Sequence, residues 1–249
     1  MAAMTGPAMA GPVMRLAITG TDTGVGKTVV ACALVAALRD RGLRVGALKP
    51  VETGIAARDA STDGARLRHA AGDVDPVELV CPIIYDEPLA PWVAARRAGR
   101  PVDLARLDAA VDTLGRDRDA LVVEGAGGLL VPFTRELSFA DLARRWSLDV
   151  VIVAANRLGA LNHTLLTLRE AERRGLRVRA IALVAPVPND ADPIATASNA
   201  ATLADLASPV PIVPIARVRP PDSLHDRQLL ATLGAPLAAT VAATLLDGH

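Results

Sequence analysis

The residues best suited to bind a phosphate form a glycine-rich loop at positions 20–28, with the sequence GTDTGVGKT. Glycines allow backbone N–H groups to turn toward an anion, and a helix that begins directly after them adds the positive end of its dipole. Lys27 and Thr28 carry the side chains that reach phosphate oxygens and Mg²⁺. Five residues separate Gly20 from Gly26, so the loop is longer than the common form. The pattern predicts a nucleotide-binding site.

A second lysine adds to this chemistry. Of the 27 basic residues, only Lys27 and Lys49 are lysines, and the other 25 are arginines. The two residue types are not interchangeable where a compact point charge must fit. Lys49 ends an apolar stretch, and the carboxyl ends of parallel strands are where ligands collect. A lysine after a strand is usually a solvated loop residue, but this coincidence predicts a catalytic or phosphate-binding role. Thr53 offers a hydroxyl to a substrate nearby.

Two carboxylates are candidate ligands for Mg²⁺, which prefers hard oxygen atoms. Glu124 ends an apolar stretch and is followed by the open turn GAGG at 125–128, so it is expected at the same edge of the sheet as the lysines. Asp63 stands at the start of a helical pattern, where an aspartate is commonly only a cap. Asp59 is its local competitor, and the residue pattern leaves the choice open.

A second helix start follows the apolar stretch at 150–154, in the sequence NRLGALNHT at 156–164. Its N-terminus is suited to hold a carboxylate. An equally good interpretation is that Asn162 simply caps the helix.

These residues need a scaffold, and apolar runs alternating with helical periodicity predict one. Strands are expected at 15–19, 44–48, 120–123, 150–154, 180–184 and 211–213. Helices are expected at 27–41, 104–114, 138–145, 162–174, 194–206 and 236–246. Consecutive apolar positions in several strands indicate burial on both faces. The fold class is therefore α/β: a single domain with a mainly parallel sheet and helices on both faces. The stretch 56–101 is the least regular, and its prolines indicate loops and short helices.

Composition excludes several classes of function. The 249 residues are 51% hydrophobic and 2% aromatic, with zero formal net charge, which argues against a nucleic-acid surface. Two cysteines and four histidines without a Cys-x-x-Cys pair argue against disulfides and a zinc site. Residues 1–13 lack the pattern of a signal peptide and are expected to be a disordered extension before a domain at 14–249. No membrane span is expected, and a cytoplasmic location follows.

Taken together, the motifs resemble the dethiobiotin synthetase family of phosphate-loop ATPases. The motifs that carry the resemblance are GTDTGVGKT at 20–28, KPVETG at 49–54, VEGAGG at 123–128 and LGALNH at 158–163. The first alone is shared with many phosphate-loop proteins, whereas the four in this order and spacing are specific. The resemblance covers most of the chain from Met14 onward, and the long loop is typical of that family.

The resemblance implies roles for individual residues. Lys49, with Lys27, would be catalytic, and Thr28, Asp63 and Glu124 would hold Mg²⁺. ATP would contact Gly24, Val25, Gly26, Lys27, Thr28, Val29, Asp63, Glu124, Gly125, Ala126, Gly127, Pro214, Ile215 and Ala216. The other substrate would contact Thr23, Thr53, Gly159, Ala160, Leu161 and Asn162.

The resemblance also implies a reaction. The substrates would be 7,8-diaminononanoate, CO₂ and ATP, and the product dethiobiotin, a precursor of biotin. Family enzymes work as homodimers, in which the helix start at 159–162 of one subunit receives the carboxylate of substrate bound to the other.

One departure from the family pattern concerns recognition of the nucleotide base. Relatives can carry an Asn-Asp pair after the strand matching 180–184, where the asparagine reads adenine, but here the stretch 184–187 is VAPV.

Two rivals are weaker. A cobyrinate-amidating relative would normally need an attached glutamine-hydrolysing domain, for which the chain has no room. A switch-type ATPase usually carries a further lysine early in the phosphate loop, where this loop has threonine and aspartate.

Overall fold

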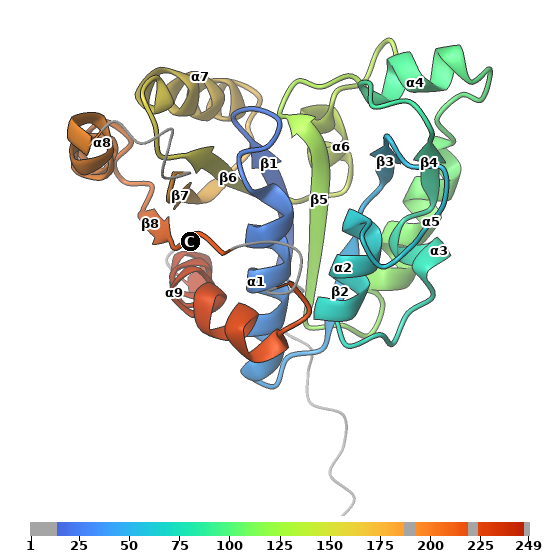
Figure 1. Cartoon of the computed structure of the whole chain (residues 1–249), viewed down its shortest axis with the longest axis horizontal. Helices are drawn as coiled ribbons and strands as arrows, with labels where there is room; N and C mark the ends of the chain where they lie inside the picture. The colour runs from blue at the N-terminus through green and yellow to red at the C-terminus, as the bar shows by residue number, and fades with distance from the viewer. Residues whose placement is uncertain (1–13, 187–192, 219–223, 247–249) are drawn as a thin grey trace, which may run out of the picture.

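A six-stranded parallel sheet forms the centre of the protein (Figure 1). The computed structural model describes residues 14–186, 193–218 and 224–246. The strand order is β2-β5-β1-β6-β7-β8, so the first strand lies in the middle of the sheet. The strands are β1 (Met14–Gly20), β2 (Val45–Leu48), β5 (Ala120–Gly128), β6 (Asp149–Ala155), β7 (Val178–Val184) and β8 (Ile212–Ile215). Because all are parallel, their carboxyl ends share one edge, where the candidate site residues follow β1, β2 and β5.

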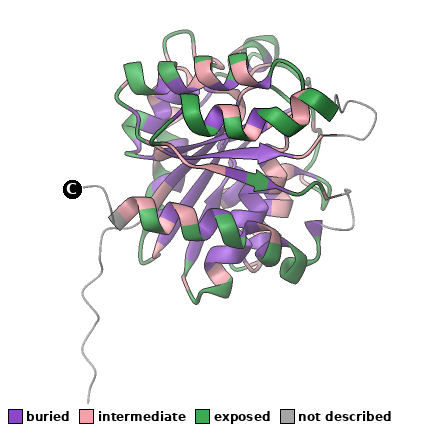
Figure 2. Ribbon diagram, turned by 90° about the vertical axis from the view of Figure 1, so that its left-hand side faces the viewer, coloured by how far each residue is buried: buried purple, intermediate pink, exposed green. Residues whose placement is uncertain are grey.

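Helices cover both faces of this sheet, and the buried residues lie between the layers (Figure 2). One face is covered by α1 (Lys27–Asp40) and α9 (Arg227–Leu246), with α2 (Asp63–Ala70) beside them. The other is covered by α5 (Leu104–Gly115), α6 (Phe139–Arg145) and α7 (Ala160–Arg173). α8 (Pro193–Leu206) lies next to α7 and β8. The strands are apolar throughout because both of their faces are buried.

A second, smaller sheet carries the residues after Lys49. It pairs β3 (Val51–Thr53) with β4 (Ile83–Tyr85) in parallel and shares no strand pairing with the large sheet. The short helices α3 (Val77–Val80) and α4 (Pro91–Arg97) accompany it. The chain passes from β2 to β3 through only Lys49 and Pro50, so this junction has little freedom to move the lysine.

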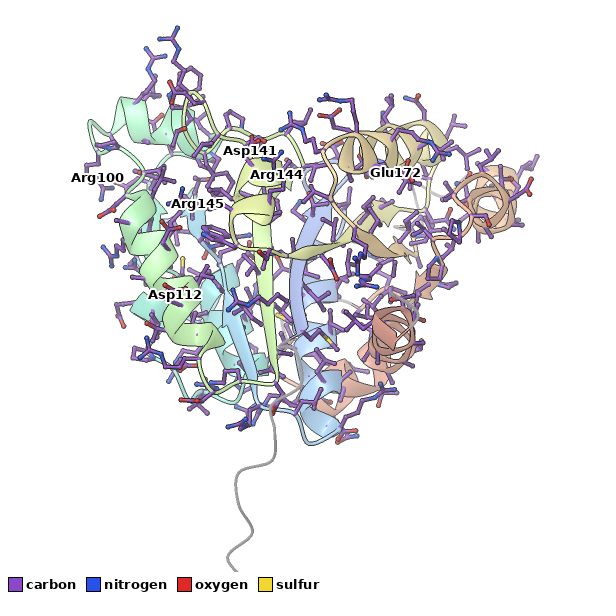
Figure 3. All side chains as sticks on the ribbon, turned by 180° about the vertical axis from the view of Figure 1, so that it is seen from behind. Arg100, Asp112, Asp141, Arg144, Arg145 and Glu172 are labelled. Carbon is purple, nitrogen blue, oxygen red and sulfur yellow. The ribbon has the colours of Figure 1, made fainter. Side chains whose placement is uncertain are left out.

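Ion pairs connect α6 to α5 and to the end of α7, and Figure 3 labels the α6 residues Asp141 and Arg145 that take part in them. Arg145 of α6 donates to Asp108 of α5 at 2.9 Å, and Arg174 at the end of α7 lies 3.0 Å from Asp141 of α6. Asp141 also closes a capping box with Ser138, the N-cap of α6. These pairs are partly exposed, so they contribute little individually to stability.

The α/β architecture predicted from the sequence is confirmed, and all six predicted strands belong to the large sheet. Two helix starts were predicted wrongly. α7 begins at Ala160 with Gly159 as its N-cap, so Asn162 lies within the first turn and does not cap the helix. α9 begins at Arg227, well before Pro236, which lies inside it. Residues 227–245 of α9 are long and apolar enough to cross a bilayer by length and composition alone, a criterion that a core helix also meets, and Leu230, Leu237 and Val241 of this helix are buried in the core.

The backbones of α1 and α9 approach closely at Gly234, which yields a stability prediction. A Cβ at this position would lie 2.0 Å from the carbonyl oxygen of Ala33. Helix propensity alone would make Gly234→Ala stabilising by about 1 kcal/mol. Because two backbones must separate, we expect a net loss of about 2 kcal/mol in the free energy of unfolding, measured with urea. Exposed Ala239→Ser in the same helix is the control, and a stabilised Gly234→Ala protein would contradict the prediction.

Candidate active site

The phosphate loop joins the centre of the sheet to α1 as the sequence predicted. Gly24 and Gly26 have φ values of 74° and 102°, which side-chain-bearing residues rarely adopt. Gly26 is the N-cap of α1, so the first N–H groups of that helix open toward the loop. Lys27 is buried and its Nζ donates to the carbonyl oxygen of Asp22 at 3.0 Å. Burial lowers the pKa of Lys27, and the nearby charge of Glu124 opposes that shift.

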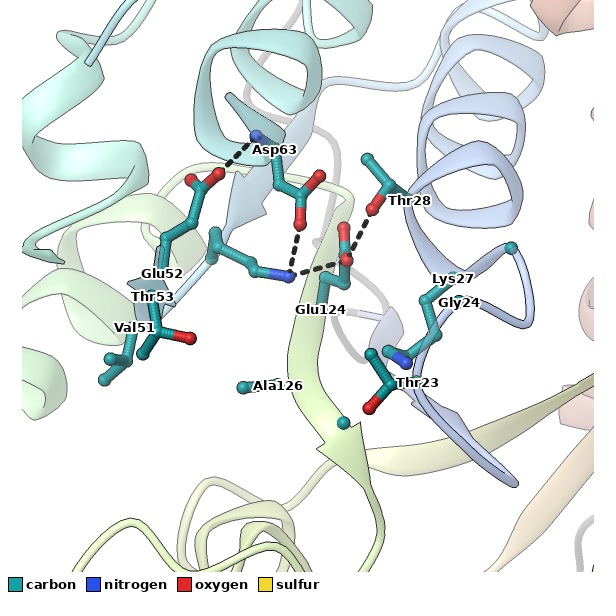
Figure 4. A pocket seen from close by; sticks show the side chains of 13 residues that line it. Thr23, Gly24, Lys27, Thr28, Val51, Glu52, Thr53, Asp63, Glu124 and Ala126 are labelled. Carbon is teal, nitrogen blue, oxygen red and sulfur yellow. Dashed lines mark hydrogen bonds and ion pairs between the residues drawn. The ribbon is translucent and has the colours of Figure 1, made fainter. Parts of the chain in front are cut away.

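Lys49 lies between Asp63 and Glu124, two side chains that are labelled in Figure 4. Its backbone N–H donates to the carbonyl oxygen of Val80 at 2.7 Å. Its Nζ donates to Asp63 Oδ2 at 2.8 Å and to Glu124 Oε1 at 2.7 Å. Burial alone would lower the pKa of Lys49, but the charges of Glu124 and Asp63 outweigh it and raise the pKa well above its usual value. The lysine is therefore a fixed positive charge.

Thr28 connects this cluster to the phosphate loop, because its hydroxyl donates to Glu124 Oε1 at 2.9 Å. Glu124 is fully buried, and burial raises its pKa although the charge of Lys49 opposes the shift. Burial also disfavours the charged form of Asp63, but the charge and hydrogen bond of Lys49 lower its pKa overall. Two carboxylates, a hydroxyl and an ammonium group therefore meet where β2, β5 and α1 converge.

The donor set fits a magnesium ion. Glu124 Oε2 is buried and has no hydrogen-bond partner among the described residues. Among residues 14–186, 193–218 and 224–246, no group of three or more His, Cys, Asp or Glu residues is arranged to hold a metal. A cation here would thus bind one hydroxyl and two carboxylates, and complete its shell with water and phosphate oxygens, as Mg²⁺ commonly does. Asp59, the competing aspartate, is exposed and accepts hydrogen bonds from Ser61.

A cleft of about 460 Å³ opens in front of these groups. It is lined by Thr23, Gly24, Gly26, Lys27, Thr28, Lys49, Val51, Glu52, Thr53, Asp63, Glu124, Ala126 and Gly127. Half of the predicted nucleotide and substrate residues, ten of twenty, are therefore brought together with Lys49 in one cleft. Val51 and Glu52 were missed, because nothing in the sequence distinguishes a buried glutamate in a three-residue strand from a solvated one.

Some predicted residues do not line this cleft. Val25 is buried in the core, and a Cβ on Gly125 would lie 2.5 Å from the ring of Phe139, so this glycine is needed for packing. The carboxyl end of β8, with Pro214, Ile215 and Ala216, lies at the same edge of the sheet. A smaller pocket of about 90 Å³ nearby is lined by Thr23, Gly24, Val25, Ala155, Arg157, Pro186 and Arg217.

The start of α7 is also outside the cleft of its own chain. Ala160 is buried, whereas Gly159 and Asn162 are exposed. Leu158, just before the N-cap of α7, is 77% exposed, and Leu166 within α7 is 62% exposed. This arrangement leaves the predicted carboxylate-binding turn accessible from outside.

Comparison with known proteins identifies close relatives. Residues 14–222 match the family model described as an AAA domain. An ATP-dependent dethiobiotin synthetase from Anaeromyxobacter dehalogenans strain 2CP-C is 49% identical over 197 residues, which are 79% of this chain and 87% of that protein. The corresponding synthetase from Aquifex aeolicus is 44% identical over 170 residues, 68% of this chain and 76% of that one.

Solved structures support the same fold. The chain covers 97% of a protein in the MinC:MinD cell division complex from Aquifex aeolicus, with a TM-score of 0.54 and 13% sequence identity, over 95% of its own length. At this identity the likeness concerns the fold alone.

Proposed function

The chain belongs to the family of ATP-dependent dethiobiotin synthetases, and from this membership we propose that its cleft converts 7,8-diaminononanoate, CO₂ and ATP to dethiobiotin, ADP and phosphate. The observation that carries the proposal is the meeting of Lys49, Glu124 and Thr28 in front of the phosphate loop. The reaction is a ring-closing ligation in biotin synthesis. The rival activity, that of a switch ATPase, rests on likeness of fold only.

The chemistry explains why positive charge is concentrated here. One amine of the substrate takes up CO₂ to form a carbamate and releases a proton. A carbamate oxygen then attacks the γ-phosphorus of ATP, and ADP leaves. The second amine attacks the carbonyl carbon, and phosphate leaves as the cyclic urea forms. Two anions, carbamate and triphosphate, must approach each other, and Lys27 and Lys49 neutralise the charge that accumulates between them.

We assign Mg²⁺ to Thr28, Asp63 and Glu124. The unpartnered Oε2 atom of Glu124 and the hard oxygen ligands support the assignment. The ion would supply further charge neutralisation between the phosphates. With ATP in place, we expect Lys49 to face the transferred phosphate and Thr53, which lines the other side of the cleft, to bind the diamine.

Phosphate release tests the overall proposal. We expect release from ATP that depends on both the diaminononanoate and bicarbonate, followed with a coupled phosphate assay. ATP hydrolysis that ignores the diamine and is stimulated by DNA or lipid vesicles would overturn the proposal.

We further propose that the protein works as a homodimer, with the start of α7 serving the partner's cleft. The exposed Leu158 and Leu166 beside that turn support an interface. In a two-fold dimer each site would then combine Lys49 of one chain with Asn162 of the other.

Subunit mixing tests this arrangement. Lys49→Ala and Asn162→Asp should each be nearly inactive alone. After dissociation and reassociation of an equal mixture, half of the dimers are mixed and each has one intact site, so about a quarter of wild-type activity should return. The control mixes Lys49→Ala with Glu124→Gln, which damage the same half-site, and should restore nothing. A fully active monomer at assay concentration would contradict the proposal.

Base selectivity is a separate prediction. Val184, Ala185 and Pro186 have no polar side chain, and Pro186 has no backbone donor. Val187 and the alternative contacts Asn189 and Asp190 lie outside the described residues. Without a polar readout, the penalty that rejects a wrong base is lost. We expect CTP, GTP or UTP to support turnover within roughly tenfold of ATP, a difference of about 1.4 kcal/mol, in steady-state assays. Strict ATP dependence would show that the loop reads adenine.

A further inference from the structure

Glu52 contacts the backbone of Asp63, the residue proposed to bind the metal. It lies on β3, three residues after Lys49, and is only 6% exposed. Its Oε1 atom accepts a hydrogen bond from the backbone N–H of Asp63 at 2.6 Å. Its Oε2 atom accepts one from the N–H of Gly64 at 3.0 Å. Figure 4 shows the carboxylate facing the first turn of α2.

These two bonds satisfy N–H groups of the first helical turn that the N-cap side chain does not reach. Thr62 is already the N-cap of α2, and its side chain accepts from Ala65 N–H at 3.3 Å. Glu52 therefore provides a second, charged acceptor, and it binds the backbone of Asp63 directly. Asp63 Oδ2 in turn accepts a hydrogen bond from Lys49 Nζ. Lys49, Glu52 on β3 and Asp63 in the first turn of α2 therefore form a closed ring of contacts.

The surroundings leave this carboxylate little freedom. The thiol of Cys81 lies 3.6 Å from Glu52 Oε2. A Cβ on Gly64 would lie 2.4 Å from the Cβ of Cys81, so glycine is required for the helix start to lie this close. Among the described residues, no basic side chain is hydrogen bonded or ion paired to Glu52, so its charge is compensated by the N–H groups and dipole of α2.

We propose that Glu52 is a positioning residue that fixes Asp63 for Mg²⁺ binding by holding the first two N–H groups of α2. The inference rests on the proposed function, because it concerns the metal assigned to that site. An amide cannot replace the carboxylate. It has one acceptor oxygen, and its NH₂ group would face an N–H donor. Glu52→Gln should thus displace Asp63 while preserving shape.

The experiment measures ADP binding by calorimetry with and without Mg²⁺. In the wild-type protein Mg²⁺ should tighten ADP binding, and in Glu52→Gln this tightening should shrink about tenfold, as expected when support of a metal ligand is lost. Binding of ADP alone should be unchanged, which also shows that the phosphate loop is folded. Thr62→Ala is the matched control, because it removes a cap from the same helix without touching the Asp63 N–H.

A double-mutant cycle separates positioning from general stability. If Glu52 acts through Asp63, Glu52→Gln should add almost nothing to Asp63→Asn. Three outcomes would overturn the role of Glu52 but leave the metal assignment standing. They are full additivity of the two substitutions, an effect of Thr62→Ala equal to that of Glu52→Gln, and a wild-type Mg²⁺ response of Glu52→Gln. If the wild-type protein showed no effect of Mg²⁺ on ADP binding, the metal assignment and the inference would both fail.

Discussion

Replacement of Lys49 by alanine is expected to reduce kcat by roughly 10²-fold or more while ADP affinity stays within about threefold of wild type. Lys49 Nζ donates to Asp63 and Glu124, two of the three carboxylates that line the cleft, but to no backbone group of the phosphate loop. We therefore expect its charge to act on the reacting groups, so that its loss raises the reaction barrier more than it weakens nucleotide binding. Lys49→Arg should also be poor, since a planar guanidinium does not fit the place of a compact ammonium group.

Steady-state kinetics and ADP calorimetry check this result. Lys27→Ala is the useful comparison, because Lys27 belongs to the loop itself and its loss should weaken nucleotide binding as well. Near-normal turnover of Lys49→Ala would refute the assigned role.

Replacement of Glu124 by glutamine is expected to raise the Mg²⁺ concentration for half-maximal activity by about 10- to 100-fold. Glutamine loses the charge. With its carbonyl oxygen placed to accept from Thr28 and Lys49, its amide NH₂ group replaces Oε2, the unpartnered atom that we assign to Mg²⁺. Asp63→Asn should act in the same direction. Magnesium titrations of turnover are the measurement.

Asp59→Asn is the matched control for these changes. The Asp59 carboxylate is exposed and hydrogen bonded to Ser61, away from the cleft. Its replacement should leave the Mg²⁺ requirement unchanged. A shift with Asp59→Asn and none with Asp63→Asn would mean that the wrong aspartate is assigned.

The large sheet could be predicted because its strands carry a strong signal. Burial on both faces requires consecutive apolar residues, as in the stretch that precedes Glu124. The small sheet could not, since β3 and β4 have three residues each and show no period. The start of α9 was missed because Pro236 is typical of a first helical turn, yet here it lies inside the helix.

The candidate site, too, contains residues that could be predicted from the sequence and residues that could not. Lys27, Lys49 and Glu124 could be found because each follows an apolar strand at the edge where parallel strands bind ligands. The motifs also gave the family, which the comparisons confirm. The choice between Asp63 and Asp59 depended on contacts across the fold, and so did the placement of Glu52, whose partners are backbone groups eleven and twelve residues away. The roles of these residues stay predictions until the variants are measured.

The separation of the two sheets has a consequence for amide hydrogen exchange. A two-stranded sheet is only marginally stable by itself, so the segment around β3 and β4 should open more readily than the six-stranded core. The side chains of Lys49 and Asp63 connect this segment to Glu124 in the core. Nucleotide binding at the phosphate loop, by strengthening that connection, should slow exchange in β4, a strand with no residue lining the nucleotide cleft. A nucleotide bound at the phosphate loop would thus make the small sheet more rigid, including a strand that the nucleotide does not touch.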